Sequence, residues 1–306
     1  MPQSRAKPAA RRGNAPASPR LRPVQARVGR AQRWVGDHRL SAFDANRPLQ
    51  GPTSRGRIVF PPPPPPLLAV QDEVRAAFGW SLGEDQRSAH DLSDCMRSPE
   101  PFGVPHWSSE AREVHLEHLA SMCRAASRVV VVGAAATVEE VTAASGPGTV
   151  FIAADGAAGA VPGHLPLLAV ISDLDGGEHL HAAVKRGLVV VLHAHGDNRS
   201  TWEQYLAAWA DLETPPPLVL THQVPESVAG LHNPGGFTDG DRAVCLLRWM
   251  GVPLDALAFV GFALDKVGPW SGMTDPSRKL QKLTWMAEVL HRLGVMHEAL
   301  PLDENS

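Results

Sequence analysis

Six short apolar runs in the second half of the chain constrain its fold more than any other feature. They are Val129–Val132, Val150–Ala153, Leu167–Ile171, Leu188–Leu192, Leu218–Leu220 and Leu257–Val260. Each run is continuous rather than alternating with polar residues, which is expected of a strand buried on both faces. Helical segments such as Trp202–Leu212 and Asp241–Met250 lie between several of the runs. The pattern predicts an α/β fold built on a doubly wound, mostly parallel sheet.

Two segments of different character precede the α/β region. Residues 1–57 hold 13 of the 29 Lys and Arg but only 2 of the 32 Asp and Glu, and six prolines follow at 61–66. This composition predicts that residues 1–66 form a disordered basic arm ending in a stiff polyproline spacer. Apolar residues then recur at helical spacing, as at Val70, Val74 and Phe78. We therefore expect a small helical subdomain over residues 67–128 and an α/β domain over residues 129–306.

Charge and composition narrow the classes of function. Beyond residue 57 the chain has 16 basic and 30 acidic residues, a net charge of −14, which argues against nucleic-acid binding by the folded body. No apolar stretch reaches the roughly 18 residues of a membrane span. The three cysteines lack CxxC spacing and cannot all pair, which indicates reduced thiols and a cytoplasmic protein. Small molecules are the expected partners, and a homo-oligomer is left open.

Polar residues follow the apolar runs where the strands are predicted to end. Asp155-Gly156 follows the second run, Asp173-Leu174-Asp175-Gly176 the third, and His193-Ala194-His195-Gly196-Asp197-Asn198 the fourth. Ligands of open α/β sheets bind outside the carboxyl ends of the strands. Carboxylates without thiolates favour a hard cation such as Mg²⁺. Asp173 and Asp175 lie two apart, so on an extended segment both would face one ion.

Other readings of these residues stay open. His193, His195 and Asp197 could bind zinc if a further ligand, such as His222 or Asp239, joined them. Each histidine could equally serve a structural role by hydrogen bonding the loop. The chain contains neither a phosphate-binding P-loop motif nor a GxGxxG after its first run, so sites of those two kinds are not expected.

Two segments have the features of anion sites. Gly235-Gly236-Phe237-Thr238-Asp239-Gly240-Asp241-Arg242 precedes a predicted helix, and backbone amides of a glycine-rich turn at a helix start bind anions. A helix cap at Thr238 or Asp239 would explain only part of that string. Lys279 and Lys282 lie in the first turns of the last predicted helix, Ser277–Leu293, where the helix dipole disfavours cations unless an anion is bound. A solvated basic face is the alternative there.

At these motifs the chain resembles the archaeal 6-hydroxymethyl-7,8-dihydropterin diphosphokinases of the MptE type, over roughly residues 68–294. The matching strings are Ala154–Ala157, Ser172–Gly176, Val191–Asn198, Thr221–Gln223, Gly235–Arg242 and the pair Lys279 and Lys282. The chain departs from the family pattern at Gly133–Thr137 and Gly261–Asp265. The resemblance implies a thiamin-pyrophosphokinase-like α/β fold.

The resemblance also implies an activity: diphosphate transfer from ATP to the pterin alcohol, giving AMP, in the biosynthesis of folate- or methanopterin-type coenzymes. It implies Mg²⁺ ligands among Asp155, Asp173, Asp175 and Asp239. Binding of the ATP phosphates is expected from Gly133, Gly235, Gly236, Thr238, Asp241, Arg242, Lys279 and Lys282. Asp197, or one of His193 and His195, would orient or deprotonate the hydroxymethyl group. The alternatives are another acceptor such as thiamin, or a non-catalytic accessory domain of the same fold.

Overall fold

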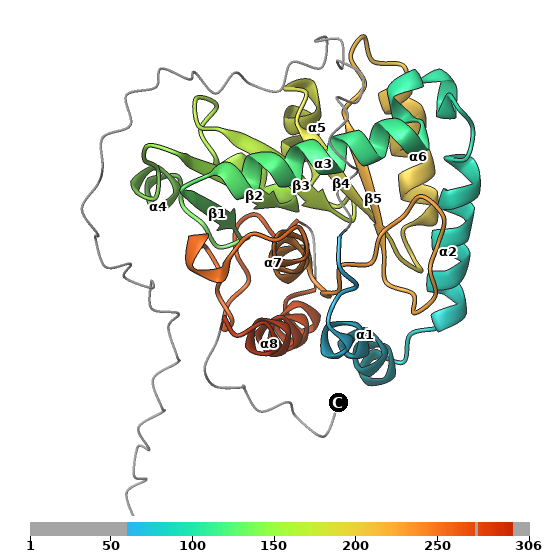
Figure 1. Ribbon diagram of the computed structural model, residues 1–306. Helices are drawn as coiled ribbons and strands as arrows, with labels where there is room; N and C mark the ends of the chain where they lie inside the picture. The colour runs from blue at the N-terminus through green and yellow to red at the C-terminus, as the bar shows by residue number, and fades with distance from the viewer. Residues whose placement is uncertain (1–59, 273–274, 296–306) are drawn as a thin grey trace, which may run out of the picture.

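The structure is a computed structural model that describes residues 60–272 and 275–295 (Figure 1). A six-stranded, all-parallel sheet with the order β5-β4-β3-β2-β1-β6 forms its centre. The strands are β1 (Arg128–Val132), β2 (Thr149–Ala154), β3 (Leu167–Ser172), β4 (Val189–Ala194), β5 (Leu218–His222) and β6 (Leu257–Val260). All six predicted runs are strands, so the predicted parallel α/β sheet is confirmed.

Eight α-helices and four short 3-10 helices accompany the sheet in the described ranges. The α-helices are α1 (Pro65–Phe78), α2 (Leu82–Cys95), α3 (Ser109–Ala125), α4 (Val138–Ala143), α5 (Gly177–Lys185), α6 (Arg199–Ala210), α7 (Asp239–Trp249) and α8 (Pro276–Arg292). The 3-10 helices are η1 (Pro101–Gly103), η2 (Pro105–Trp107), η3 (Asp155–Ala160) and η4 (Leu254–Ala256). None of the helices that the structure describes combines the length and the apolar character that a bilayer span requires.

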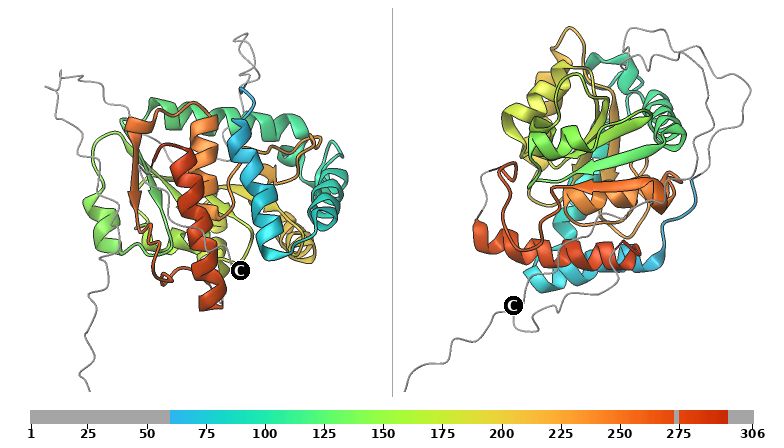
Figure 2. Two further views of the ribbon diagram at one scale, coloured as in Figure 1. Left: turned by 90° about the horizontal axis from the view of Figure 1, so that it is seen from below. Right: turned by 90° about the vertical axis from the view of Figure 1, so that its left-hand side faces the viewer.

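Two hydrophobic cores lie on opposite faces of the sheet, because successive side chains of a strand point to opposite sides. On one face Val131 of β1 packs in a core with residues of α3 and α7, including Leu116 and Leu247. On the other face Val130 packs in a core with residues of α5 and α6, including Trp202. Figure 2 shows helices on both sides of the strands. The strands read as continuous apolar runs because both of their faces are covered.

The helices that precede the sheet are shared between these cores. Leu92 of α2 belongs to the core that contains Val130, whereas Leu116 of α3 belongs to the opposite one. Helix α1 packs beside α8. The division into a helical subdomain and an α/β domain at residue 128 remains a prediction. The part of the predicted arm up to residue 59 lies outside the described residues. The predicted polyproline spacer at 61–66 is described, and the expectation of a spacer without secondary structure is wrong at its end: α1 begins at Pro65, since proline fits the first turn of a helix.

The order of the strands creates a crevice between β1 and β6. From β1 the chain adds β2 to β5 on one side, and β6 then pairs with the other side of β1, which is the switch point where α/β sheets bind ligands. Beyond the strands, the Ala135 amide donates to the Gly261 carbonyl (3.0 Å). Gly261 has φ 72°, and a Cβ there would lie 2.0 Å from the Ala136 nitrogen. Only glycine allows the two loops to approach this closely.

We expect Gly261→Ala to destabilise the protein far more than Gly187→Ala, a matched control. Both glycines have positive φ, but a Cβ at Gly187 would have no atom within 4 Å. The free energy of unfolding of the control should therefore fall by only about 1–2 kcal/mol, the cost of a left-handed backbone conformation for alanine. Gly261→Ala should lower the free energy of unfolding by at least about 2 kcal/mol more, because the backbone atoms of Ala136 must move away from the new Cβ. Urea unfolding measures both, and equal losses would contradict the contact between the loops.

Candidate active site

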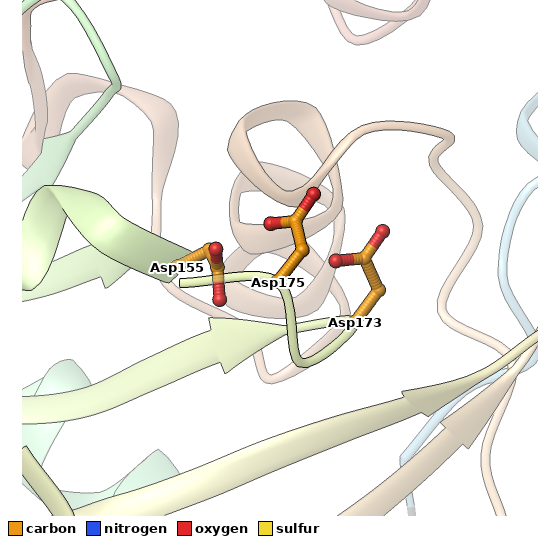
Figure 3. A group of neighbouring side chains, drawn as sticks. All are labelled: Asp155, Asp173 and Asp175. Carbon is orange, nitrogen blue, oxygen red and sulfur yellow. The ribbon is translucent and has the colours of Figure 1, made fainter. Parts of the chain in front are cut away.

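Three carboxylates meet at the carboxyl ends of two neighbouring strands (Figure 3). Asp155 follows β2, and Asp173 and Asp175 follow β3. One oxygen of each carboxylate lies within 4.8 Å of the others. The convergence expected for Asp155, Asp173 and Asp175 is therefore present, and the group is hereafter the carboxylate cluster.

The backbone at the cluster is turned rather than extended. Leu174, between Asp173 and Asp175, has φ 80°, and Asp155 has φ 46°, both in the left-handed region. The expectation of an extended Asp173–Asp175 segment is thus wrong in its geometry, although the two carboxylates do converge. The Ser172 hydroxyl donates to Asp155 and accepts from the Leu174 amide (2.8 Å), which holds the turn. Non-glycine residues held at positive φ concentrate at functional sites.

Electrostatics at the cluster favour a bound cation. Burial, together with the hydrogen bond to Asp175, raises the pKa of Asp155 well above its usual range. Burial and the charge of Asp173 raise the pKa of Asp175, and the same two causes raise that of Asp239 to about 8. Oδ1 of Asp173 is buried and has no hydrogen-bond partner among the described residues. Crowded carboxylates with an unpartnered oxygen and no thiolate among them suit Mg²⁺.

His195 connects the cluster to Asp197. Its Nε2 lies 3.5 Å from Oδ2 of Asp173, and its Nδ1 lies 2.7 Å from Oδ1 of Asp197. Burial opposes a charge on the imidazole, but the hydrogen bonds to the two carboxylates outweigh it and raise the pKa of His195 to about 9. The Asp197 side chain is 85% exposed. His195 is therefore a cation near neutral pH, and Asp197 presents a carboxylate to solvent.

His193 occupies a different position. It is buried, with Nδ1 3.1 Å from the Thr221 hydroxyl and Nε2 3.3 Å from Oε1 of Gln223. Burial lowers its pKa well below the usual value, so the ring is neutral. Both of its nitrogens are engaged away from His195, which leaves the alternative zinc set without one of its ligands. The hydrogen-bonding role that was left open for this histidine fits its surroundings.

The glycine-rich string builds the start of α7. Asp241 accepts hydrogen bonds from the backbone amides of Phe237 and Thr238 and from the Thr238 hydroxyl. Gly235 and Gly236 have φ 89° and 90°, and a Cβ at Gly236 would lie 2.7 Å from the Arg242 Cα. These residues therefore shape the turn, which places Thr238 and Asp239 at the crevice.

The guanidinium of Arg242 is hydrogen bonded to groups of the protein itself. Its Nη1 donates to Oδ1 of Asp239 (2.9 Å), and its Nη2 donates to the Phe237 carbonyl (2.6 Å). Its side chain is only 4% exposed. The arrangement positions Asp239, and any effect of Arg242 on a bound phosphate is a longer-range effect of its charge.

The crevice between β1 and β6 extends to the carboxylate cluster. Of the predicted residues, those that line it are Gly133, Asp155, Asp175, Thr238, Asp239 and Lys279. Residues that the sequence did not single out also line it, among them Lys266, Gly268, Trp270 and Ser271. The Ser271 hydroxyl is buried without a partner in the part of the chain that the structure describes. Its only sequence signal is its place in the long connection after the last apolar run.

Lys282 lies beside an aromatic residue from the connection between α1 and α2. Its Nζ lies 5.6 Å from the centre of the Trp80 ring, and the guanidinium of Arg278 lies 5.4 Å from the same ring. Such contacts with a ring stabilise cations. The positive charge of Lys282 also helps to lower the pKa of Asp173, after the larger effects of His195 and Arg242.

Three known proteins that are similar to this chain share the same name. No family model matches the chain. It is 32% identical over 226 residues to the 6-hydroxymethyl-7,8-dihydropterin pyrophosphokinase of Pyrococcus furiosus, over 70% of this chain and 87% of that protein. Proteins of the same name from Methanothermobacter thermautotrophicus and Methanocaldococcus jannaschii are 39% identical over 94 residues and 35% identical over 85. Those two alignments span 38% and 32% of the relatives' lengths.

Magnesium is expected to stabilise the protein through the cluster. Saturation at about 100 times the dissociation constant adds roughly 2.7 kcal/mol, which raises Tm by about 5 °C or more for a chain of this size. Asp175→Asn should remove most of this rise without lowering Tm in EDTA. Asp255→Asn, at the amino end of β6, is the matched control and should keep the full rise. A rise in Asp175→Asn equal to that of the parent protein would place the ion elsewhere.

The affinity for Mg²⁺ should increase with pH. Carboxyls with raised pKa values, such as that of Asp239 at about 8, hold protons that the cation must displace. Binding should therefore strengthen between pH 6 and 8, by up to about tenfold per unit for each proton released, and level off above that range. Calorimetric titration in buffers of different ionisation enthalpy counts the protons. Affinity that does not change across this range would show that the carboxyls are already ionised.

Proposed function

Because the chain belongs to the 6-hydroxymethyl-7,8-dihydropterin pyrophosphokinase family, we propose that it transfers diphosphate from ATP to that pterin alcohol, releasing AMP. The observation that carries the proposal is the alignment over 87% of the Pyrococcus furiosus protein, together with a carboxylate cluster at the switch-point crevice. Membership of the MptE-type subgroup and a place in folate or methanopterin synthesis are part of the proposal.

The carboxylate cluster would hold Mg²⁺ through Asp155, Asp173 and Asp175, with Asp239 close by. When bound, the ion would supply positive charge that offsets the negative charge developing on the transferred phosphate. The unpartnered Oδ1 of Asp173 and the raised pKa values of its neighbours support this assignment. Arg242 would contribute by fixing the Asp239 carboxylate through its 2.9 Å contact.

ATP would occupy the crevice between β1 and β6. Gly133 and Gly261 line it, and Met286 offers an apolar wall. Lys279 lines the crevice and Lys282 stands near Asp173, so both ammonium groups can neutralise the triphosphate. Arg242 is already paired with Asp239, which supports the two lysines as the residues that bind the phosphates.

The acceptor would approach from the side of β4. In the sheet the order β6-β1-β2-β3-β4 places the carboxylate cluster between the crevice and the loop that carries His195 and Asp197. In-line transfer needs the attacking and leaving oxygens on opposite sides of phosphorus. The hydroxymethyl oxygen would form its bond to the β-phosphorus while the bridge to the α-phosphate breaks, so that AMP leaves.

Asp197 would accept the proton of the hydroxymethyl group. Its carboxylate is exposed and is held by Nδ1 of His195 at 2.7 Å. His195, with its pKa raised to about 9, is already protonated and would orient Asp197 rather than take the proton. His193 is buried against Thr221 and Gln223 and would take no part in the proton transfer.

Asp173→Asn is expected to reduce AMP formation by at least about 100-fold, because it removes several kcal/mol of charge stabilisation. AMP release is measured with ATP, Mg²⁺ and the hydroxymethyl pterin, and circular dichroism checks the fold. Asp255→Asn is the control and should retain full turnover. AMP production by Asp173→Asn at the rate of the parent protein would overturn the role of the carboxylate cluster.

The acceptor is tested separately. The proposal expects pterin-dependent AMP release and no comparable release with thiamin. Selective turnover of thiamin would assign another acceptor to the same fold. No magnesium-dependent AMP release with either acceptor would overturn the proposed activity and leave a non-catalytic domain.

A further inference from the structure

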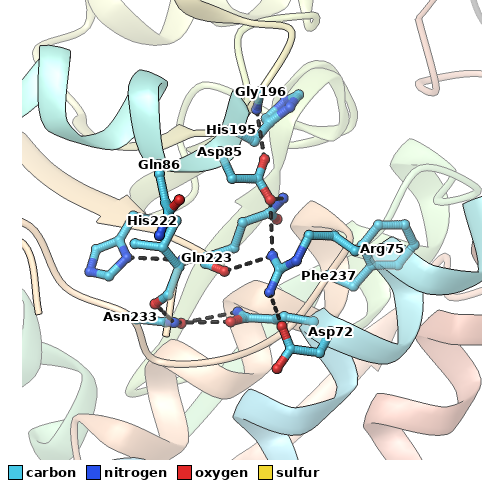
Figure 4. A network of polar contacts seen from close by, with 12 residues as sticks. Asp72, Arg75, Asp85, Gln86, His195, Gly196, His222, Gln223, Asn233 and Phe237 are labelled. Carbon is cyan, nitrogen blue, oxygen red and sulfur yellow. Dashed lines mark hydrogen bonds and ion pairs between the residues drawn. The ribbon is translucent and has the colours of Figure 1, made fainter. Parts of the chain in front are cut away.

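A buried carboxylate from α2 contacts the loop that carries His195 and Asp197 (Figure 4). Asp85 is only 5% exposed, and its Oδ1 accepts a hydrogen bond from the backbone amide of Gly196 at 2.8 Å. Gly196 lies between His195 and Asp197 in the sequence. A group 111 residues away in the chain therefore fixes the middle of this loop, which spans residues 195–198 after β4 and is hereafter the β4 loop.

The second oxygen of Asp85 is also fully used. Its Oδ2 accepts from Nη1 of Arg75 and from Nε2 of Gln223, both at 2.9 Å. Gln223 in turn contacts the ring of His193 through Oε1. A buried charge persists only when it is paired and hydrogen bonded, and this one has three donors from three segments. The contacts with Arg75 and Gln223 therefore fix the carboxylate independently of its contact with the β4 loop.

The β4 loop fits closely on the start of α2. A Cβ at Gly196 would lie 2.9 Å from the Cβ of Glu84, so the loop backbone rests directly on the helix. One turn further along α2, the Ser88 hydroxyl lies 3.5 Å from Oδ1 of Asn198, which also accepts from the His195 amide at 3.0 Å. Nδ2 of Asn198 donates to the Asp173 carbonyl at 3.2 Å. Helix α2 thus supports the loop at Gly196 and at Asn198.

We propose that Asp85 is a positioning residue that holds the His195–Asp197 pair against Asp173. Its side chain touches none of the reacting groups in the proposed reaction, and it acts through the Gly196 amide. The contact between His195 and Asp173 is already 3.5 Å long. A small displacement of the β4 loop would break it, and displacements of about 1 Å in a catalytic site can reduce rates about 100-fold.

A purely structural role for Asp85 predicts a different outcome. The ion pair with Arg75 links α1 to α2, and its loss would lower the stability of the whole protein without a specific effect on the β4 loop. Ala89→Gly provides the matched control, because Ala89 lies in the same helix, is fully buried and belongs to the hydrophobic core. It weakens α2 but leaves the side chain that accepts from the Gly196 amide in place. Asp94→Asn, on the exposed side of the same helix, controls for loss of a charge.

The first measurement needs no turnover. Amide hydrogen exchange over residues 193–199 is compared in Asp85→Ala, which removes the acceptor of the Gly196 amide, in Ala89→Gly and in the parent protein. Asp85→Ala should accelerate exchange at Gly196 and its neighbours at least tenfold more than Ala89→Gly does, while exchange in β1 and β3 stays unchanged. Equal exchange of the loop in the two variants would overturn the proposal.

The second measurement is a kinetic cycle, and it rests on the proposed function. Asp85→Ala should lower kcat for AMP release by about 10- to 100-fold with the KM for ATP within about threefold, since the nucleotide crevice lies elsewhere. In a His195→Ala background the same change should cost threefold or less, because groups that act as a unit are non-additive. Magnesium should still raise Tm in Asp85→Ala.

The outcomes separate the two proposals. An unchanged kcat in Asp85→Ala, or a full additional loss on top of His195→Ala, would overturn the positioning role while leaving diphosphate transfer intact. Absence of AMP release from the parent protein would overturn the proposed function. The exchange measurement would then still decide whether Asp85 holds the β4 loop.

Discussion

Repulsion among carboxylates at one edge of the sheet is the interaction on which the rest of the site depends. All strands run in the same direction, so Asp155, Asp173 and Asp175 must meet at the carboxyl edge. Burial makes their mutual repulsion costly, as the raised pKa values of Asp155 and Asp175 show. Two neighbouring cations partly neutralise this negative charge: His195 contacts Asp173, and Arg242 contacts Asp239.

These cations do not neutralise every carboxylate alike. His195, Arg242 and Lys282 together hold the pKa of Asp173 below its usual range despite burial, so this carboxylate stays charged. Asp155 and Asp175 have no comparable ion pair among the described residues, and their protons are held more tightly. The cluster therefore combines one permanent charge with neighbours that ionise when a cation arrives. That arrangement suits reversible binding of Mg²⁺ with its substrate better than a permanently occupied structural site.

The fold could be predicted from sequence because the strands are buried on both faces. Val129–Val132, for example, must be apolar at every position, and this leaves an unambiguous run. Residues that work through their side chains at strand ends, such as Asp173, were equally visible. Arg242 and Asp241 were placed near phosphates because a glycine-rich helix start favours anions, but the string could not reveal that both are paired within the turn.

Asp85 and Ser271 escaped prediction for a different reason. Each stands in a segment with ordinary spacing. Asp85 matters only through partners that the fold brings from far along the chain, and Ser271 only because the fold brings it to the crevice. Asp85 reads as a favourable acidic residue in the first turn of a helix. Nothing in the sequence connects it with Gly196, 111 residues away. Periodicity reveals contacts within an element, whereas contacts between elements need the topology first.

The alanines after β1 show how such distant contacts can compensate for a change in a motif. Ala135 and Ala136 stand where a nucleotide crevice needs the backbone to approach closely, yet the glycines that permit it lie in the facing loop. A Cβ at Gly268 would lie 2.5 Å from the Ala135 nitrogen, and a Cβ at Gly261 would lie 2.0 Å from the Ala136 nitrogen. Conformational freedom is needed on only one side of a close contact. The departure from the family pattern at these alanines is therefore compatible with a closed crevice, and it does not by itself favour a non-catalytic domain.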